Sequence, residues 1–365
     1  MKWQKRCVLG YEDLAPSRDD ARVLGVFNPG AIRIGDTVHL MVRVAEQPIA
    51  PEGRYRLPRF RRNGELVIDD HAAHEVREID ARVAIDPTSG HARLTSVSHL
   101  RHYHVDVDRI EEPSAYVASG HAFWPDGITE AYGVEDPRLT RVGDRIVMTY
   151  VSVSRHGACT SLALTEDFES FERAGVIFPN ENKDVLILPT EVGETGMAFH
   201  RPVSSTPFGT PEMWYADSID GRRFGNHRPI EFDTAVPSGP GRGDGAADSH
   251  WASGRIGGGT VPIRTAEGWL HMFHGNEASS VPGQVGRYCG ALMLNDADSP
   301  WRVRAVSGPV LQPTESFERE GFVPSVVFPT AWIDVGDRVA IFYGAADERV
   351  AVATIDRKEL LAELS

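Results

Sequence analysis

The chain has 365 residues, of which 41% are hydrophobic and 25% are charged, and its formal net charge at pH 7 is -14. This length allows two average domains or one large unit, and the sequence lacks the run of about 18 apolar residues that a membrane span requires. The negative charge disfavours nucleic acid and anionic lipid surfaces as partners, so an anionic ligand needs a local cationic pocket.

The amino-terminal segment carries basic residues but neither the apolar stretch nor the small-residue cleavage site of a secretory signal, which predicts a cytoplasmic protein. Cys7, Cys159 and Cys289 are scattered without CxxC spacing, so we expect reduced thiols that are mostly buried. The segment "HYH" at 102–104 has no carboxylate at ligand spacing. We therefore expect a solvated strand at this segment and no metal site.

Five segments along the chain share one pattern: a proline, a short apolar stretch, a glycine turn and a second, strongly apolar run. Each turn lies between runs rich in Val, Ile, Phe and Tyr, which is the signal of a β-hairpin. The turn glycines are Gly35, Gly143, Gly193, Gly268 and Gly336. Because the intervals accommodate about four short strands each, the pattern predicts a five-bladed β-propeller.

A helix is indicated only at the carboxyl end, where Asp356 is a candidate N-cap for "DRKELLAELS". No Pro/Gly/Ser-rich linker divides the chain, so we expect one domain over residues 1–365. The predicted fold is therefore all-β, a five-bladed β-propeller with a short C-terminal helix. A β-sandwich or two stacked β-domains is the alternative, but it does not predict one hairpin pattern repeated five times.

In a propeller the innermost strands converge on a central channel, so residues at equivalent places in the hairpins meet in space. Polar residues interrupt or end the apolar runs at such places: Asn28, Arg43, Glu135, Asp136, Arg138, Lys183, Asp184, His200, Arg201, His274 and Asp347. Taken singly, each is explained as a hydrogen-bonded structural residue. Their similar placement in several hairpins predicts a shared polar site.

Seven motifs, in order, carry a resemblance to a known family: "FNPGA", "VEDPRLT", "ENKDVLILP", "FHRP", "GRIGGGTVPI" with "FHG", "FVPSVVFP" and "YGAAD". Together they resemble the motif set of glycoside hydrolase family 130, the β-mannoside phosphorylases and related mannosidases. The resemblance runs from about residue 25 to residue 355. It implies a five-bladed propeller and an attack with inversion on a β-mannoside.

By this resemblance, Asp136 is the proton donor, acting through the 3-hydroxyl of the bound mannosyl unit. Asn28, Arg43, Glu135 and Asp347 fall on positions that line the mannosyl subsite, and Arg138, which can anchor a neighbouring carboxylate, joins the substrate-binding set. The positions that hold phosphate fall on Lys183, Arg255, His274 and Tyr288. The charges match those of many family phosphorylases, but arginine and lysine are exchanged between two of these positions.

The chemistry of this set favours a phosphorylase. An inverting glycosidase needs an acid and a base, whereas phosphate arrives as an anionic nucleophile and needs cationic donors instead. We expect no cofactor beyond inorganic phosphate as co-substrate. We further expect the adjacent Glu135 and Asp136 to disfavour double ionisation, which keeps one proton near neutral pH.

Two other functions stay open. A β-mannosidase of the same family uses glutamates as acid and base, for which Glu191 and Glu277 are candidates; a carbohydrate-binding propeller has no turnover. The predicted partners are a β-manno-oligosaccharide and phosphate, with the linkage (β-1,2, β-1,3 or β-1,4) undetermined. We expect loops at residues 45–65 and 205–250 to select the acceptor sugar, and a monomer or homodimer.

Overall fold

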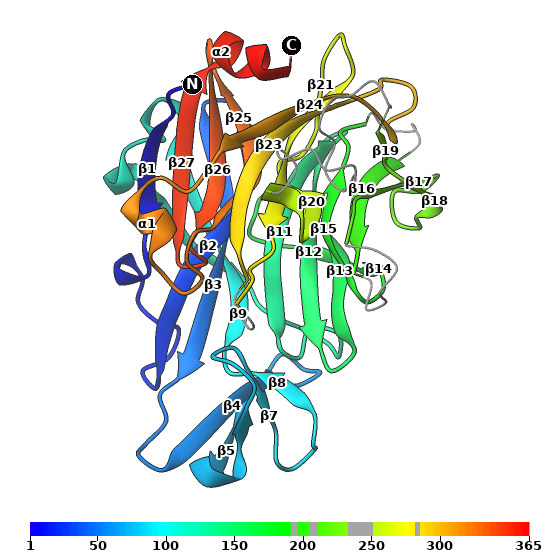
Figure 1. Ribbon diagram of the computed structural model, residues 1–365. Helices are drawn as coiled ribbons and strands as arrows, with labels where there is room; N and C mark the ends of the chain where they lie inside the picture. The colour runs from blue at the N-terminus through cyan, green and yellow to red at the C-terminus, as the bar shows by residue number, and fades with distance from the viewer. Residues whose placement is uncertain (191–195, 204–210, 233–250, 282–284, 365) are drawn as a thin grey trace.

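The computed structural model describes residues 1–190, 196–203, 211–232, 251–281 and 285–364. The regular secondary structure of the described residues is almost entirely β-strand, as predicted (Figure 1). The α-helices are short: α1 (Ser316–Arg319) and α2 (Arg357–Leu361). Single 3-10 turns lie at Tyr11–Asp13, Ala73–Glu75, Val107–Arg109, Pro113–Ala115 and Ala362–Leu364.

The amino-terminal half forms two antiparallel groups of strands. The first contains β2 (Ala21–Ile34), β3 (Thr37–Pro48), β9 (Val97–Asp106) and β10 (Val117–Phe123). The second contains β11 (Gly133–Val142), β12 (Arg145–Ser154), β13 (Gly157–Thr165) and β14 (Glu172–Phe178). A single parallel pair, Gly133 with Ser98, links the two groups into one sheet.

Three further antiparallel sheets follow. One is β15 (Asn182–Ile187), β16 (Gly196–Pro202), β17 (Trp214–Ser218) and β18 (Gly225–Pro229). The next is β20 (Arg255–Gly258), β21 (Ile263–Arg264), β22 (Trp269–Glu277), β23 (Arg287–Asn295) and β24 (Arg302–Leu311), with β19 (Glu231–Phe232) at its edge. The last is β25 (Val327–Val335), β26 (Arg338–Ala345) and β27 (Arg349–Asp356), completed by β1 (Gln4–Leu9) from the start of the chain.

The structure confirms four of the predicted hairpin turns, which join β2 to β3, β11 to β12, β21 to β22 and β25 to β26 at Gly35, Gly143, Gly268 and Gly336. Gly193 lies outside the described residues. The predicted helix cap is also confirmed. The Asp356 side chain accepts hydrogen bonds from two backbone N–H groups at the start of α2, those of Lys358 (2.8 Å) and Glu359 (3.1 Å).

Buried apolar clusters fill the space between successive sheets. Each cluster contains residues from two neighbouring groups of strands, and one cluster joins β2 and β3 to β26 and β27. Members from the two groups of strands in each cluster are, for example, Val42 and Phe342, Leu100 and Met148, Leu162 and Ala198, Phe199 and Phe273, and Met272 and Ile341. The first and last groups of strands therefore pack on each other, and both chain ends lie at the same end of the molecule (Figure 1).

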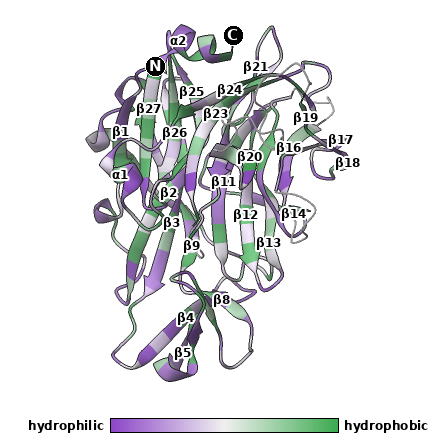
Figure 2. Ribbon diagram, in the orientation of Figure 1, coloured by the Kyte–Doolittle hydropathy of each residue, from purple (hydrophilic) through white to green (hydrophobic). Residues whose placement is uncertain are grey.

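A small module between β3 and β9 projects from the main body (Figure 1). It consists of β4 (Arg54–Phe60), β5 (Leu66–Ala72), β6 (Arg77–Glu78), β7 (Val83–Ile85) and β8 (Ala92–Leu94). Its strand β4 is largely hydrophilic, unlike the strands of the large sheets (Figure 2). The buried Arg93 holds the module together by bonding Asp69 (2.7 Å) and the carbonyl oxygen of Leu57 (2.9 Å).

The expected solvated strand at 102–104 is wrong for His102, which is buried. Its Nδ1 lies 2.9 Å from the Ser119 hydroxyl, and its ring stacks on Phe168 with the centroids 4.8 Å apart. Cys159 and Cys289 are buried free thiols, whereas Cys7 is partly exposed. Among the described residues, no helix is long and apolar enough to span a bilayer.

Candidate active site

Three strands, β2, β11 and β15, carry the same backbone irregularity. The ladder shifts its register between Phe27 and Gly30 in β2, between Glu135 and Arg138 in β11, and between Lys183 and Leu186 in β15. Within these bulges, Asn28, Asp136 and Asp184 adopt positive φ angles of 47°, 48° and 55°. Asn and Asp tolerate this left-handed region better than most residues, and a bulge redirects a side chain at the edge of a functional site.

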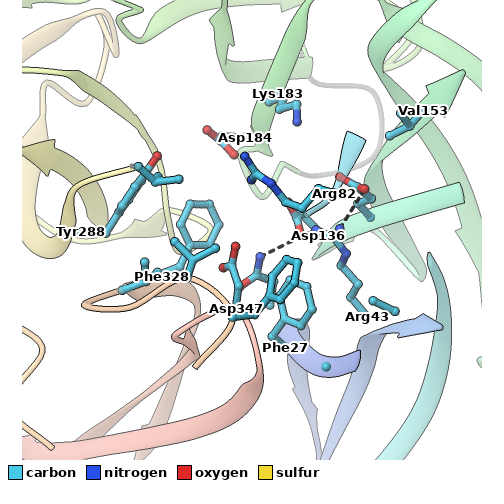
Figure 3. Close-up of a pocket in the computed structure, with 18 of the residues that line it drawn as sticks. Phe27, Arg43, Arg82, Asp136, Val153, Lys183, Asp184, Tyr288, Phe328 and Asp347 are labelled. Carbon is cyan, nitrogen blue, oxygen red and sulfur yellow. Dashed lines mark hydrogen bonds and ion pairs between the residues drawn. The ribbon is translucent and has the colours of Figure 1, made fainter. Parts of the chain in front are cut away.

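The bulges open onto one cavity of about 640 Å³. Its lining includes nine of the ten residues that the sequence predicts for the site: Asn28, Arg43, Glu135, Asp136, Lys183, Arg255, His274, Tyr288 and Asp347. They come from segments that are far apart in the sequence, and Arg43, Asp136, Lys183, Tyr288 and Asp347 are seen around a common space in Figure 3. The cavity has a carboxylate end, formed by Asn28, Arg43, Glu135, Asp136 and Asp347, and a cationic end, formed by Lys183, Arg201, Arg255, His274 and Tyr288.

At the carboxylate end, Arg43 connects the two adjacent acids. Its guanidinium group lies 2.8 Å from Glu135 Oε1 and 3.0 Å from Asp136 Oδ1; Arg43 and Asp136 are labelled in Figure 3. Its Nε donates to the Ser98 hydroxyl at 3.0 Å. Asn28 Nδ2 also donates to Asp136 Oδ1, at 2.9 Å. Both acids are therefore held in fixed positions by donors from β2 and β3.

These donors oppose the expectation that Asp136 keeps a proton near neutral pH. Burial raises the pKa of Asp136, but Arg43, the Asn28 hydrogen bond and Lys183 outweigh burial, so the pKa is lowered overall. The carboxyl with a raised pKa is Asp347: burial, reinforced by the charge of Asp136, raises its pKa to about 6 despite the nearby Arg43. Between Asp136 and Asp347, it is therefore Asp347 that retains a proton up to about pH 6.

Replacing Asp347 by asparagine is expected to stabilise the protein above pH 6 by on the order of 1–3 kcal/mol. The pKa of the Asp347 carboxyl is about 6 in the folded protein, whereas its ordinary value is 3.8. Between these pH values the folded state therefore binds a proton that the unfolded state has released. Stability of the parent protein therefore falls as the pH rises through this window, and the variant avoids the loss. Asparagine also tolerates the φ of 52° at this position.

Urea unfolding of the parent and of Asp347→Asn at about pH 4 and pH 8 measures this effect. The account requires the stability difference to grow in favour of the variant at the higher pH. An equal difference at both pH values would mean that the native carboxyl titrates normally.

At the cationic end, Asp184 organises the basic residues. Arg201 Nη2 lies 2.8 Å from Asp184 Oδ2, and His274 Nε2 lies 3.6 Å from the same oxygen. Burial lowers the pKa of His274 to about 3, so its imidazole is neutral at pH 7. A Cβ atom on Gly257 would lie 2.6 Å from both Asp184 Oδ2 and His274 Cε1, so only glycine fits this backbone position.

Several donors at the cationic end have no partner among the described residues. Buried N–H groups of Arg201 (Nε and Nη1) and Arg255 (Nε) make no hydrogen bond within this set. Burial also raises the pKa of Tyr288, which keeps its phenol protonated as a donor. Because unpaired buried donors are costly, this end is suited to an anion that accepts several hydrogen bonds.

Arg138 differs from its predicted role in binding substrate, since it is not among the residues that line the cavity. Its buried guanidinium group donates to the carbonyl oxygens of Gly259 (2.7 Å), Pro137 (3.1 Å) and Asp136 (3.3 Å). It therefore fixes the backbone behind Asp136. The hydrogen bonds from its guanidinium group link the β11 bulge to the segment that follows β20.

The structure adds residues to the site to which the sequence assigned no role. From the sequence, Arg201 was recognised only as a polar residue that interrupts an apolar strand. In the structure it lies opposite Lys183 in the pairing of β15 with β16. This register was not predictable from either motif alone. Asp80 and Arg82, from the module, also line the cavity. No sequence signal marked them, because they lie outside the repeated hairpins.

The predicted acceptor loops correspond only partly to the cavity. Of residues 45–65, Ala45 alone lines it, and the module and the segment that follows it contribute Asp80, Arg82, Val83, Leu94 and Ser96 instead. In the second predicted loop, residues 205–210 and 233–250 lie outside the described part of the chain. Within the described ranges, no group of three or more His, Cys, Asp or Glu side chains could hold a metal ion.

Comparison with known proteins identifies the family. The glycoside hydrolase family 130 model, described as beta-1,4-mannooligosaccharide phosphorylase, matches residues 92–364. A beta-1,2-mannobiose phosphorylase of Listeria innocua is 33% identical over 363 residues, covering 96% of this chain and 94% of the relative. A beta-1,4-mannooligosaccharide phosphorylase of Ruminococcus albus is 33% identical over 228 residues, covering 60% of this chain and 62% of the relative.

A solved structure agrees with these matches over the whole chain. The complex of the Listeria innocua beta-1,2-mannobiose phosphorylase with beta-1,2-mannobiose superimposes with a TM-score of 0.83 and 30% identity, covering 100% of this chain and 99% of that chain. The chain therefore belongs to glycoside hydrolase family 130.

Proposed function

We propose that this protein is an inverting phosphorylase that cleaves a β-mannosidic bond with inorganic phosphate and releases α-mannose 1-phosphate. The observation that carries the proposal is a single cavity with two chemically different ends. The carboxylate end has an oriented acid and hydroxyl-binding groups, and the cationic end has unpaired buried donors. A sugar and a phosphate ion bound side by side require this combination.

In the proposed reaction, the mannosyl unit binds at the carboxylate end, where Glu135 and Asn28 are available to its hydroxyl groups. Arg43 and Asn28 hold the Asp136 carboxyl in place, and Asp136 donates the proton to the leaving oxygen through the sugar 3-hydroxyl. A phosphate oxygen attacks the anomeric carbon from the opposite side while the bond to the leaving sugar breaks. The product is the α-anomer because this displacement inverts the configuration.

In this scheme Asp136 must carry a proton before it can donate one to the leaving oxygen. The pKa of Asp136 is lowered by Arg43, Asn28 and Lys183, whereas burial raises the pKa of Asp347 to about 6. A bound phosphate adds negative charge next to Lys183, which weakens the effect of this cation on Asp136 and raises the pKa of the carboxyl. Binding of phosphate therefore favours the protonated form of Asp136 that the reaction uses.

The cationic end supplies the second substrate site. We assign phosphate binding to Lys183, Arg255, His274 and Tyr288. Among the described residues Lys183 forms no ion pair, so its charge is available to an anion. The neutral His274 and the protonated Tyr288 act as donors without adding charge, and Arg255 offers a fork that matches two phosphate oxygens.

We propose that the fold is a single domain over residues 1–365, a five-bladed β-propeller. Support comes from the packing of five antiparallel groups of strands in chain order and from the cluster that joins the last group to the first. The pairing of β1 with β27 ties the start of the chain into the last group. In such a fold the bulged inner strands meet around the channel that forms the site.

The chemistry also supports a cytoplasmic location and a reaction without a further cofactor. Phosphorolysis consumes inorganic phosphate and yields a sugar phosphate, which a cell retains only inside its membrane. Displacement of a sugar by phosphate changes no oxidation state, so the reaction needs no redox cofactor. We also propose that the protein is a monomer or a homodimer.

Hydrolysis by a β-mannosidase is less well supported. Glu277, a candidate base for that reaction, pairs with Arg287 at 2.8 Å and is not among the residues lining the cavity. The other candidate, Glu191, lies outside the described residues. A non-catalytic lectin has no use for the unpaired donors of the cationic end.

The substrate we propose is β-1,2-mannobiose, supported by the similarity over nearly the full chain to a relative named for this sugar. Incubating the protein in phosphate buffer with β-1,2-mannobiose, β-1,4-mannobiose and mannosylglucose tests both the reaction and the linkage. We expect α-mannose 1-phosphate to form from the β-1,2-linked sugar at the highest rate. A faster reaction with a β-1,4-linked sugar would contradict the linkage, and no sugar phosphate from any of them would contradict the function.

A further inference from the structure

The module between β3 and β9 extends the cavity wall beyond the large sheets. Asp80 and Arg82, in the turn between β6 and β7, line the cavity together with Val83, Leu94 and Ser96. Arg82 is directed into the cavity (Figure 3). The turn therefore places a carboxylate and a guanidinium group at the wall of the cavity.

The backbone of this turn is fixed by hydrogen bonds. Asp80 Oδ1 accepts from the N–H groups of Arg82 (2.7 Å) and Val83 (3.0 Å), and Thr95 N–H donates to the Arg82 carbonyl at 2.9 Å. Within the same module, the buried Arg93 of β8 forms hydrogen bonds with Asp86 and with the backbone of β4. The Arg82 side chain is 48% exposed, so its base is anchored while its end is accessible to a ligand.

The charge at this turn suits sugar hydroxyl groups better than phosphate. Arg82 Nη2 lies 3.7 Å from Asp80 Oδ2, so the positive charge has a neighbouring negative one. A hydroxyl group both donates and accepts, and a carboxylate beside a guanidinium group provides a partner for each role. A phosphate dianion is repelled by Asp80 and finds unpaired donors elsewhere in the cavity.

The position of the module agrees with a role in binding the sugar and not the phosphate. The module is inserted between β3 and β9, and the strands of that group share apolar clusters with the β11 to β13 strands and with the β25 to β27 strands. The cationic end comes from the other two sheets, β15 to β18 and β20 to β24. The module and the phosphate donors therefore approach the cavity from different sides.

The inference rests on the proposed function, because an inverting displacement places the incoming phosphate and the leaving sugar on opposite faces of the anomeric carbon. We propose that Asp80 and Arg82 bind the hydroxyl groups of the leaving sugar and determine which acceptor the enzyme accepts. The mannosyl unit then lies between this pair and the cationic end. Neither residue takes part in the transfer itself.

The test uses the reverse reaction, with α-mannose 1-phosphate as donor and mannose as acceptor. Arg82→Ala is expected to raise the KM for mannose about tenfold or more, since a hydrogen bond to a charged group is lost. The KM for phosphate in phosphorolysis should change less than about twofold. Asp80→Asn keeps the acceptor oxygen of the turn but removes the charge, and it should alter acceptor affinity in the same direction.

The matched control is Arg77→Ala, which removes an exposed arginine of the same module that does not line the cavity. An unchanged KM for mannose in Arg82→Ala, or a rise confined to the KM for phosphate, would overturn the inference. Failure of the proposed function gives a different result, because the parent protein then forms no α-mannose 1-phosphate. In that event, calorimetric titration with β-1,2-mannobiose still tests the contact, and equal affinities of parent and Arg82→Ala would refute it.

Discussion

Asp136→Asn is expected to lower kcat for phosphorolysis by about 10²- to 10⁴-fold, the range that loss of a general acid produces. The amide has the shape of the carboxyl group but cannot supply its proton. Asparagine also tolerates the φ of 48° at this bulge, so the strand and the cavity should keep their form. Initial rates of α-mannose 1-phosphate release at saturating phosphate measure the effect.

Asp144→Asn is the matched control, since Asp144 is an exposed residue in the turn at the other end of the same β11–β12 hairpin. It should retain the parent rate. An unchanged Tm for Asp136→Asn would show that lost activity does not come from unfolding. Full activity in Asp136→Asn would mean that another group donates the proton, and Asp347, with its pKa of about 6, would be the next candidate.

Arg255→Ala is expected to raise the KM for phosphate about 10- to 100-fold, because a hydrogen bond between a charged donor and an anion contributes about 1.5–3 kcal/mol. Arg255 lines the cavity, and its Nε has no hydrogen-bond partner among the described residues. Removing the side chain therefore breaks no described hydrogen bond of that nitrogen. Saturation curves in phosphate at fixed mannobiose measure the change.

Two variants sharpen this result. Arg255→Lys keeps the charge but loses the fork, so its KM for phosphate should lie between those of the parent and of Arg255→Ala. Arg302→Ala, at an exposed arginine of β24, should leave both substrates unaffected. If Arg255→Ala raised the KM for mannobiose and not that for phosphate, the two ends of the cavity would be assigned the wrong way round.

The sequence predicted the site well where short motifs repeat. Asn28-Pro29 and Asp136-Pro137 are similar in sequence, and the structure gives both the same bulge with nearly equal φ angles. Equivalent positions in the hairpins therefore identified residues that meet in space, although more than a hundred positions separate Asn28 from Asp136. The glycine turns were recognisable for the same reason, since their chemistry is local.

What the sequence did not predict depends on contacts between distant segments. The lowered pKa of Asp136 comes from Arg43 and Asn28, on strands that pack beside β11 only in the folded chain. Arg201 lines the cavity because the pairing of β15 with β16 places it opposite Lys183. Arg82 lines the cavity because of where the folded chain places the turn between β6 and β7, and nothing in the local sequence specifies that position.

The most direct test of the account is the dependence of β-1,2-mannobiose cleavage on phosphate, followed by nuclear magnetic resonance. The account predicts that cleavage requires phosphate and that each bond broken yields one α-mannose 1-phosphate and one free mannose. Cleavage at the same rate without phosphate, giving two molecules of mannose, would contradict it.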